Sequence, residues 1–328
     1  MELGLSITTE GQWNMTERRT AWTNLLSLEL DAPLWKGAQA EAQVISTYHT
    51  RGDMADVYQD FSNINADNRL LRVVHLGLQQ TLAQGRLTLF AGLRQADADY
   101  FATPLASLLT GGTTGCYPVV SSNFDMNAYP FTALGLHAVY QPCDPWVIQA
   151  SLYNGVAYDT FAHSFRFRPR TDGVLSLGSV CYTSTPTDRL AFNATYMAGW
   201  NVGNHFDSEM QRRHTQAGFW ATIEQPLPLT MGRIHTALGA TYAHEFSSPL
   251  TCRNYFNVMT AFNQLTPIGG TLAIIFNRSY YNEAHESEWE MNVTMPIGQH
   301  FSIQPAIHHY STNGTRQWIG QLRVVYEL

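Results

Sequence analysis

Alternation of apolar and polar residues with a period of two runs through almost the whole chain, and it restricts the fold more than any other feature. The closing residues QWIGQLRVVYEL show the pattern. Trp318, Leu322 and Tyr326 share one face of an extended strand, while Gln321 and Arg323 lie on the other. One face suits an apolar environment and the other suits water, which is typical of a β-strand and not of a helix.

Segments of this kind recur at similar length along the chain. We count sixteen, near residues 2–14, 21–33, 37–50, 69–82, 85–95, 130–141, 145–155, 172–184, 188–200, 215–226, 232–245, 253–264, 269–280, 285–296, 300–311 and 317–328. The connections alternate between tight turns such as QPCDP and a second class that contains the stretches 51–68, 96–129, 156–171 and 201–214. Short turns on one side and longer loops on the other are typical of an up-and-down outer-membrane β-barrel.

The physics of the bilayer supports an all-β, antiparallel transmembrane barrel made of one domain, residues 1–328. A tilted strand of about 10 residues crosses the hydrocarbon layer. Lipid cannot satisfy backbone N–H and C=O groups, so the sheet must close on itself and the last strand must pair with the first. An even strand count then places both termini on the short-turn side, which we expect to be periplasmic.

The alternative fold is a soluble sandwich or propeller, in which alternating strands bury one face in a core. The sixteen similar segments, the two classes of connection and the lack of an internal repeat disfavour it. No run of about 20 apolar residues is present, so the sequence predicts no transmembrane helix.

The charge balance and the missing catalytic motifs argue against nucleic-acid binding and against catalysis. The net charge of −7 argues against binding to nucleic acid. Lys36 is the only lysine among 19 Lys and Arg residues, and arginine is the cation that suits ordered, hydrogen-bonded positions. The sequence contains no HExxH, CxxC, GxSxG or phosphate-loop motif, so we expect no enzyme activity, no cofactor and no metal site. Cys143 and Cys181 could form a disulfide, and free thiols are the alternative.

The stretch 96–129 is the longest connection, and it follows a strand in which the chain resembles a known family. The motifs are GRLTLFAGLRQADADYFATPLASLLTGG, AYPFTALGLHAVYQP, WVIQASLYNG and, near the end, EMNVTMPIGQHFSIQPAIHHYSTNG and GQLRVVYEL. They resemble the carbohydrate-selective porins (OprB-type) of Gram-negative outer membranes. This resemblance implies a 16-stranded porin whose third loop folds inward and narrows a channel for the passive diffusion of small sugars.

Two other functions remain open at this point. The barrel could be a general porin without selectivity. It could also be a structural or accessory subunit of a larger outer-membrane complex, with a plugged lumen. The partners that we expect are outer-membrane lipid and lipopolysaccharide, with sugars as transient solutes. A homotrimer or partner proteins in an assembly are also compatible with the sequence. The stretch FRFRPR, residues 165–170, could contact lipopolysaccharide phosphates, contact a partner or line the vestibule.

The candidate channel residues follow from strand parity and from position along the chain. They are the polar side chains expected on the water-facing side of their strands or at the start of the inward loop: Arg86, Arg94, Asp97, Asp99, Tyr100, Glu41, Arg233, His235, Glu286, Glu288, Glu290 and Arg323. Such planar donors and acceptors can exchange hydrogen bonds with sugar hydroxyls. We expect Arg86 and Arg94 to lie at the constriction, and opposed Arg and Glu groups to set a transverse field. The alternative for each residue is a wall interaction that only holds the barrel or loop 3.

Overall fold

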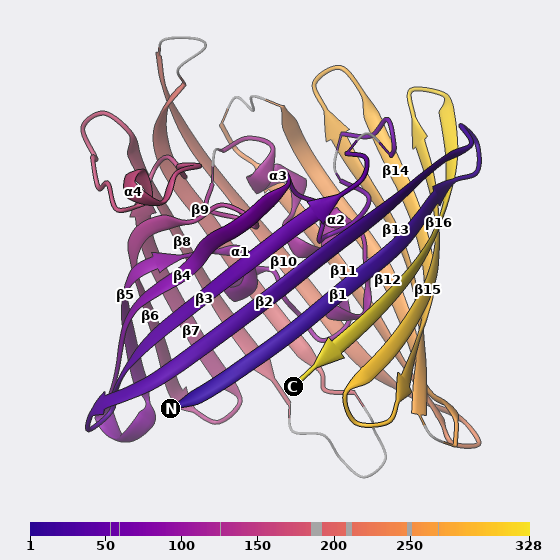
Figure 1. The fold of residues 1–328 in the computed structure, drawn as a ribbon, viewed down its shortest axis with the longest axis horizontal. Helices are drawn as coiled ribbons and strands as arrows, with labels where there is room; N and C mark the ends of the chain where they lie inside the picture. Colours follow the sequence, from indigo (N-terminus) through magenta and orange to yellow (C-terminus); the bar gives the residue numbers. More distant parts are fainter. Residues whose placement is uncertain are drawn as a thin grey trace.

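Antiparallel pairing joins every strand to the next along the chain, and β1 to β16, so the computed structural model is a closed barrel of sixteen strands (Figure 1). The strands are β1 (Glu2–Asn14), β2 (Arg19–Trp35), β3 (Ala38–His49), β4 (Arg69–Leu82), β5 (Leu87–Arg94), β6 (Ala133–Cys143), β7 (Trp146–Asn154), β8 (Gly173–Thr183), β9 (Thr195–Asp207), β10 (Arg212–Met231), β11 (Ile234–Glu245), β12 (Cys252–Thr266), β13 (Gly269–Tyr281), β14 (His285–Ile297), β15 (Phe301–Thr312) and β16 (Thr315–Glu327). The structure describes residues 1–328 except 53, 59, 125, 185–191, 208–211, 248–250 and 268.

The seam between β1 and β16 confirms that the last strand pairs with the first. Glu10 lies opposite Arg323 in this pairing, and a carboxylate oxygen of Glu10 lies 2.5 Å from the Arg323 guanidinium. Both termini lie at the lower rim in Figure 1. We call this the short-turn rim and the opposite end the long-loop rim.

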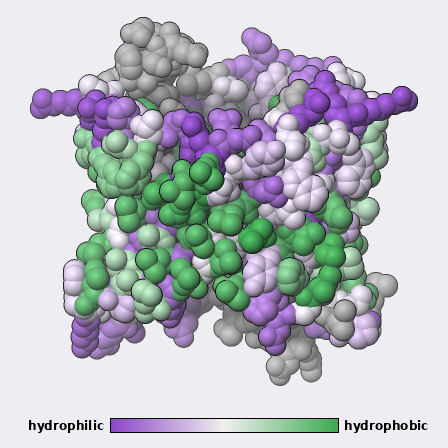
Figure 2. Space-filling view, in the orientation of Figure 1, coloured by the Kyte–Doolittle hydropathy of each residue, from purple (hydrophilic) through white to green (hydrophobic). Residues whose placement is uncertain are grey.

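On the face shown in Figure 2, hydrophobic residues gather in the middle of the barrel wall and polar residues gather toward the two rims. Trp22, Leu136 and Trp318 are among its exposed side chains. Trp13 of this outer face covers Gly320 on the neighbouring strand, where an added Cβ would lie 2.2 Å from the indole ring. The apolar outer surface suits contact with lipid, and hydrogen bonds between neighbouring strands satisfy the backbone N–H and C=O groups, so the wall meets both requirements of a bilayer.

The ninth strand is the element that the sequence misplaced. It spans Thr195–Asp207 and not 188–200, of which residues 188–191 lie outside the described residues. The stretch 201–214 is therefore not a long loop, because β9 and β10 occupy all of it except residues 208–211, which are not described. The long connections at the long-loop rim are those after β3, β5 and β7.

Cys143 and Cys181 do not form a disulfide; both are free thiols. Cys143 pairs with Trp146 across a turn, and Cys181 pairs with Val147, so β7 separates the two cysteines. Among the described residues, no helix is both long and apolar enough to cross a bilayer. The helices are single turns in the connections: α1 (Asp97–Tyr100), α2 (Gly112–Gly115), α3 (Pro118–Ser121) and α4 (Phe161–Ser164), with η1 (Ala83–Gly85) and η2 (Ala106–Leu108).

Candidate pore constriction

The connection between β5 and β6, residues 95–132, lies inside the barrel, and we call it loop 3. It carries α1, α2 and α3, which Figure 1 shows between the front and back walls. The connection between β3 and β4, residues 50–68, also enters the lumen from the long-loop rim, and we call it loop 2. The two loops contact each other directly, because the N–H of Gly112 in loop 3 donates to the Asp60 carbonyl of loop 2 at 3.0 Å.

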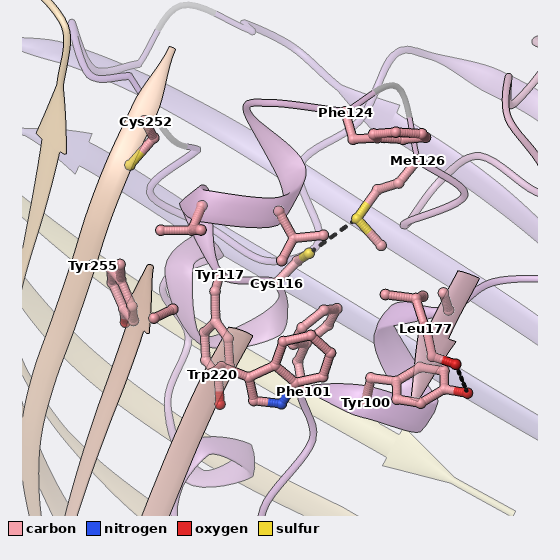
Figure 3. Packing of buried hydrophobic residues seen from close by; sticks show 14 of the residues in the cluster. Tyr100, Phe101, Cys116, Tyr117, Phe124, Met126, Leu177, Trp220, Cys252 and Tyr255 are labelled. Atoms are coloured by element: carbon pink, nitrogen blue, oxygen red, sulfur yellow. Dashed lines mark hydrogen bonds between the residues drawn. The ribbon is translucent and has the colours of Figure 1, made fainter. Parts of the chain in front are cut away.

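Loop 3 is fixed to the wall by apolar packing (Figure 3). Phe101 and Tyr117 lie with their ring centroids 5.0 Å apart, and Phe101 lies 5.0 Å from Trp220 of β10. Tyr117 also stacks on Tyr255 of β12 at 5.5 Å. Burial of several aromatic rings contributes about 1.5–3 kcal/mol for each large side chain. One side of the lumen is therefore filled with packed side chains and not with water.

Two buried carboxylates of the wall hold the middle of loop 3. Glu224 of β10 accepts hydrogen bonds from the backbone N–H of Leu105, at 3.1 and 3.2 Å, and from the Thr103 hydroxyl. Glu290 of β14 accepts from the N–H of Thr110 at 2.8 Å and of Gly111 at 3.0 Å. These acceptors satisfy loop amides that packing would otherwise leave buried without partners.

Polar contacts hold the two ends of loop 3. Near its start, the Arg94 guanidinium donates to both carboxylate oxygens of Asp99, at 2.6 and 2.5 Å. Near its end, the Asn127 side-chain amide donates to the backbone carbonyl of Arg94 at 2.8 Å, and the side-chain Oδ1 of Asn123 accepts from the N–H of Cys252 at 2.8 Å. The described part of loop 3 is therefore bound to the wall at its start, in its middle and near its end.

Loop 2 binds to β1, β14 and β16 and to loop 3. The Ser62 hydroxyl donates to Glu10 at 2.8 Å, and the Arg323 guanidinium donates to the Asn63 side chain at 2.6 Å. The N–H of Asn63 donates to the Thr110 carbonyl at 2.8 Å. The seam ion pair between Glu10 and Arg323 thus also supports the loop that faces loop 3.

Two small cavities remain between these loops. Their volumes are 200 and 280 Å³, and both are lined by Asn63, Asp97, Gly115 and Tyr129. We call these four residues the eyelet. The first cavity adds polar groups that include Asp60 and Ser62, and the second adds Gln95 and Ser107 among others. Because the cavities share the eyelet residues, they are adjacent.

Asp97 is the ionisable member of the eyelet. One carboxylate oxygen accepts from the N–H of Tyr129 at 3.0 Å, while Oδ1 is buried and has no hydrogen-bond partner among the described residues. Burial raises the pKa of this carboxyl to about 6, Asp99 adds to the rise, and the Tyr129 N–H opposes it. The eyelet therefore contains a carboxyl whose pKa is raised toward neutral pH.

A strip of charged side chains on the inward face of β3–β5 and on α1 stays partly exposed. Glu41 lies 2.9 Å from His75, and these side chains are 13% and 16% exposed. The paired Arg94 and Asp99 side chains are 19% and 10% exposed. Because these strands face the lumen here, this exposure is to the interior of the barrel. The structure thus brings Glu41, Arg94, Asp97 and Asp99 of the predicted set to one side of the lumen, with Arg323 nearby behind Asn63.

Other predicted residues lie away from the eyelet. Arg86 precedes β5 at the short-turn rim and Arg233 lies in the turn before β11; both are exposed. His235 follows at the start of β11. The structure separates Arg86 from Arg94 by the length of β5, so the expected pair at the constriction does not form. Tyr100 is fully buried, and its hydroxyl lies 2.6 Å from that of Ser151 under loop 3.

Glu286, Glu288 and Glu290 share the inward face of β14 and are all buried. Ligand atoms of Glu288, Glu290 and His308 lie within 4.8 Å of one another. Their hydrogen bonds go to protein groups, however: Glu288 accepts from Tyr310 at 2.6 Å, and Glu290 accepts from loop 3. Arg94 and Arg323 each pair with an adjacent carboxylate, Asp99 and Glu10, and the expected transverse field stays a prediction.

Sequence reasoning missed Asn63, Gly115, Tyr129, Glu10 and Glu224. The first three lie in loops, where no periodicity assigns a direction to a side chain. Glu10 and Glu224 have the inward parity of their strands, and this signal could have placed both in the lumen.

Comparisons with known proteins agree with this architecture. The family model described as "Carbohydrate-selective porin, OprB family" matches residues 35–221. A high-pH structure of Pseudomonas putida OprB superposes with a TM-score of 0.83 at 11% identity, covering 100% of this chain and 94% of that chain. The low-pH structure of the same protein gives 0.64 at 10% identity, with 100% and 92% covered.

More distant porins share the fold. A triple mutant of Rhodopseudomonas blastica porin gives a TM-score of 0.62 at 8% identity, covering 100% of this chain and 99% of that chain. Among curated proteins, none matches the sequence significantly. Structural matches at such low sequence identity show only that the fold is shared. The family model, by contrast, matches more than half of the chain.

Proposed function

The chain belongs to the OprB family of carbohydrate-selective porins and is an outer-membrane porin, and we propose that it passes small solutes, preferentially sugars, through a channel that loop 3 narrows to the eyelet. The single observation that carries the proposal is the pair of adjacent cavities between loops 2 and 3. The family and the fold point to a channel and not to an enzyme. We also propose that the long-loop rim faces the cell exterior and that both termini face the periplasm.

The chemistry of the eyelet favours neutral, hydroxylated solutes. Asn63 supplies an amide, Asp97 a carboxylate and Tyr129 an aromatic ring, while Gly115 adds no side chain and leaves a gap. These groups can exchange hydrogen bonds with hydroxyls and cover the apolar face of a sugar ring. The partly exposed strip of Glu41, His75, Arg94 and Asp99 offers further donors and acceptors along the wall.

The size of the cavities restricts the solutes. The two cavities have volumes of about 200 and 280 Å³. Both lie below the ~300–1,000 Å³ of ordinary ligand pockets. We therefore propose transient contacts that release the solute quickly, with passage that slows steeply as the solute grows.

Osmotic swelling of liposomes that contain the purified barrel tests this function. A size series of neutral sugars is compared with amino acids of similar mass. Swelling that is faster with the sugars and falls with their size supports the proposal. Equal rates for both solute classes leave a general porin and contradict the sugar preference.

One observation favours a second candidate function, an accessory barrel with a closed lumen. Loop 3 packs against the inner wall in a cluster of buried apolar side chains, and the described parts of loop 2 bond to it directly. In that case no solute causes swelling, although the heat-dependent shift in gel mobility shows that the barrel is folded.

The ionisation of Asp97 predicts a pH-dependent ion preference. Its pKa is raised to about 6, so the carboxyl is neutral below that pH and becomes an anion as the pH rises through it. We expect the preference for K⁺ over Cl⁻, measured as a reversal potential across a KCl gradient, to increase between about pH 5 and pH 7. Asp97→Asn should remove this increase and leave a flat profile. An unchanged increase in Asp97→Asn would assign the titration to another group.

A further inference from the structure

Three polar side chains on the inward face of β9–β11 are buried without their full set of hydrogen bonds. Asn201 and Gln216 are each 1% exposed, and neither polar atom of either side-chain amide has a partner among the described residues. Glu245 is 0% exposed, and its Oε2 atom also lacks a partner within the part of the chain that the structure describes. Buried polar groups are nearly always hydrogen-bonded in folded proteins, so these atoms on neighbouring strands need an explanation.

The strand register places Asn201 and Glu245 on either side of Gly218. Asn201 of β9 pairs with Gly218 of β10, and Gly218 pairs with Glu245, the last residue of β11. A Cβ on Gly218 would lie 2.8 Å from Asn201 Oδ1 and 3.2 Å from Glu245 Oε2, so both oxygens point into the space that the glycine leaves. The backbone carbonyl oxygen of His244 lies 2.9 Å from the same point. We call this space the Gly218 niche.

Glu245 brings a carboxylate to the niche, and the groups that hold this carboxylate are neutral. Its Oε1 atom accepts hydrogen bonds from the backbone N–H groups of Ala217 at 2.9 Å and Ser247 at 3.1 Å, and from the Ser247 hydroxyl. These bonds fix the orientation of the side chain with Oε2 toward Gly218. An ionised carboxylate that is removed from water is costly unless it pairs with a cation or coordinates a metal.

The atoms that face the niche are oxygens of three kinds: a carboxylate oxygen, the side-chain amide oxygen of Asn201 and a backbone carbonyl oxygen. Gln216 lies on the same face, two residues before Gly218 and diagonal to Asn201, so its unpartnered amide oxygen can reach a shared ligand. Carboxylate, amide and backbone carbonyl oxygens, completed by waters, are the ligands that Ca²⁺ takes. Mg²⁺ requires a regular octahedron and Zn²⁺ prefers nitrogen and sulfur, so both suit this set less well.

Loop 3 packs on the wall beside the niche. A Cβ on Gly203, which pairs with Gln216, would lie 2.7 Å from the Phe124 ring, so this ring rests against the neighbouring row of the sheet. Phe124 belongs to the buried cluster that Figure 3 shows. A cation in the niche would therefore join β9, β10 and β11 where the last part of loop 3 meets the wall.

We propose that the Gly218 niche binds one Ca²⁺ ion, with Glu245, Asn201 and Gln216 as its side-chain ligands. The ion compensates the charge of Glu245 and stabilises the long-loop end of β9–β11. A single carboxylate among neutral ligands makes the binding weak, with a Kd of about 10⁻⁴–10⁻³ M. The residues come from three strands and form no contiguous motif, which is why the sequence predicted no metal site.

Thermal unfolding of the full chain, refolded into an amine-oxide detergent without lipopolysaccharide, tests the proposal. Because no lipid phosphate is present, calcium acts only through the protein. We expect the midpoint temperature, followed by circular dichroism, to be about 3 °C higher in about 10 mM CaCl₂ than in NaCl of equal ionic strength. Equilibrium dialysis with radioactive calcium should show one bound ion per barrel.

Glu245→Gln distinguishes a metal ligand from a structural residue. It removes the charge at nearly constant shape, so the bound ion and the calcium-dependent rise should both be lost, while the midpoint without calcium should not fall. Asn201→Leu removes a neutral ligand and should weaken calcium binding roughly tenfold. Glu288→Gln is the matched control, because this buried carboxylate is held by Asn277, His308 and Tyr310. It should lower the midpoint and keep the calcium-dependent rise.

Three results would overturn the proposal. The first is an equal calcium-dependent rise in the wild type and in Glu245→Gln, which would place the calcium elsewhere on the barrel. The second is an equal rise with Mg²⁺ or with Na⁺, which would contradict the selection of Ca²⁺ by the ligand set. The third is a folded wild-type barrel that binds no calcium in dialysis.

Discussion

Gly115→Trp should close the channel, with sugar-driven swelling reduced about tenfold or more, because the indole would fill the gap that the eyelet leaves. Gly115 lines both cavities, and the nearest described atom to an added Cβ is the Asn63 Cβ at 3.8 Å. A large side chain therefore enters open space at this position and does not strain the backbone. Swelling of proteoliposomes with arabinose measures the effect.

Gly115→Ala is the matched control for this change. A methyl group at 3.8 Å makes an ordinary contact, so swelling should stay close to the wild-type rate. Comparison of Gly115→Trp with Gly115→Ala separates the effect of filling the gap from the effect of removing the glycine. Wild-type flux in a folded Gly115→Trp barrel would show that solutes take another path.

The double variant Glu224→Ala and Glu290→Ala should open the channel. The two carboxylates accept from the backbone N–H groups of Leu105, Thr110 and Gly111. Each buried N–H that loses its acceptor costs about 1–3 kcal/mol, which favours movement of loop 3 away from the wall and into water. We expect a larger single-channel conductance and a higher size limit for sugars. The barrel itself should persist, since the strand pairing is untouched.

Glu288→Gln is the comparison for this release. Glu288 lies on the same buried face of β14, but its hydrogen bonds go to wall residues, namely Asn277, His308 and Tyr310. It should lower thermal stability without raising conductance. A double variant with wild-type conductance would mean that the apolar packing alone fixes loop 3.

The barrel could be predicted from the sequence because its wall has to satisfy lipid and water on alternate residues. The prediction failed where a strand does not alternate between apolar and polar residues. In the second half of β9, Asn204 interrupts the outward face that contains Trp200 and Val202, so the alternation weakens although the strand continues. The weak alternation is also why the sequence predicted a loop over residues 201–214.

The candidate site could be predicted only in part. The alternation of residues gives the face of the strand on which a side chain lies but not its position along the barrel axis. Arg94 and Arg86 therefore looked equivalent, although Arg94 ends β5 next to loop 3 and Arg86 lies at the short-turn rim. The apolar side of the lumen, with Leu177 and Trp220, was also not expected, because inward residues were taken to face water. The eyelet depends on how two aperiodic loops meet, which no local pattern encodes.

Modification of a cysteine at the eyelet would test the central claim most directly. Single-channel current through Gly115→Cys is recorded before and after a water-soluble methanethiosulfonate reagent is added, with the wild type as control for the exposed native Cys143. We predict an open channel whose current falls on modification and returns with a reducing agent, while the wild-type current does not change. An unaltered current in a fully modified Gly115→Cys barrel, or no current before modification, would contradict a solute path between loops 2 and 3.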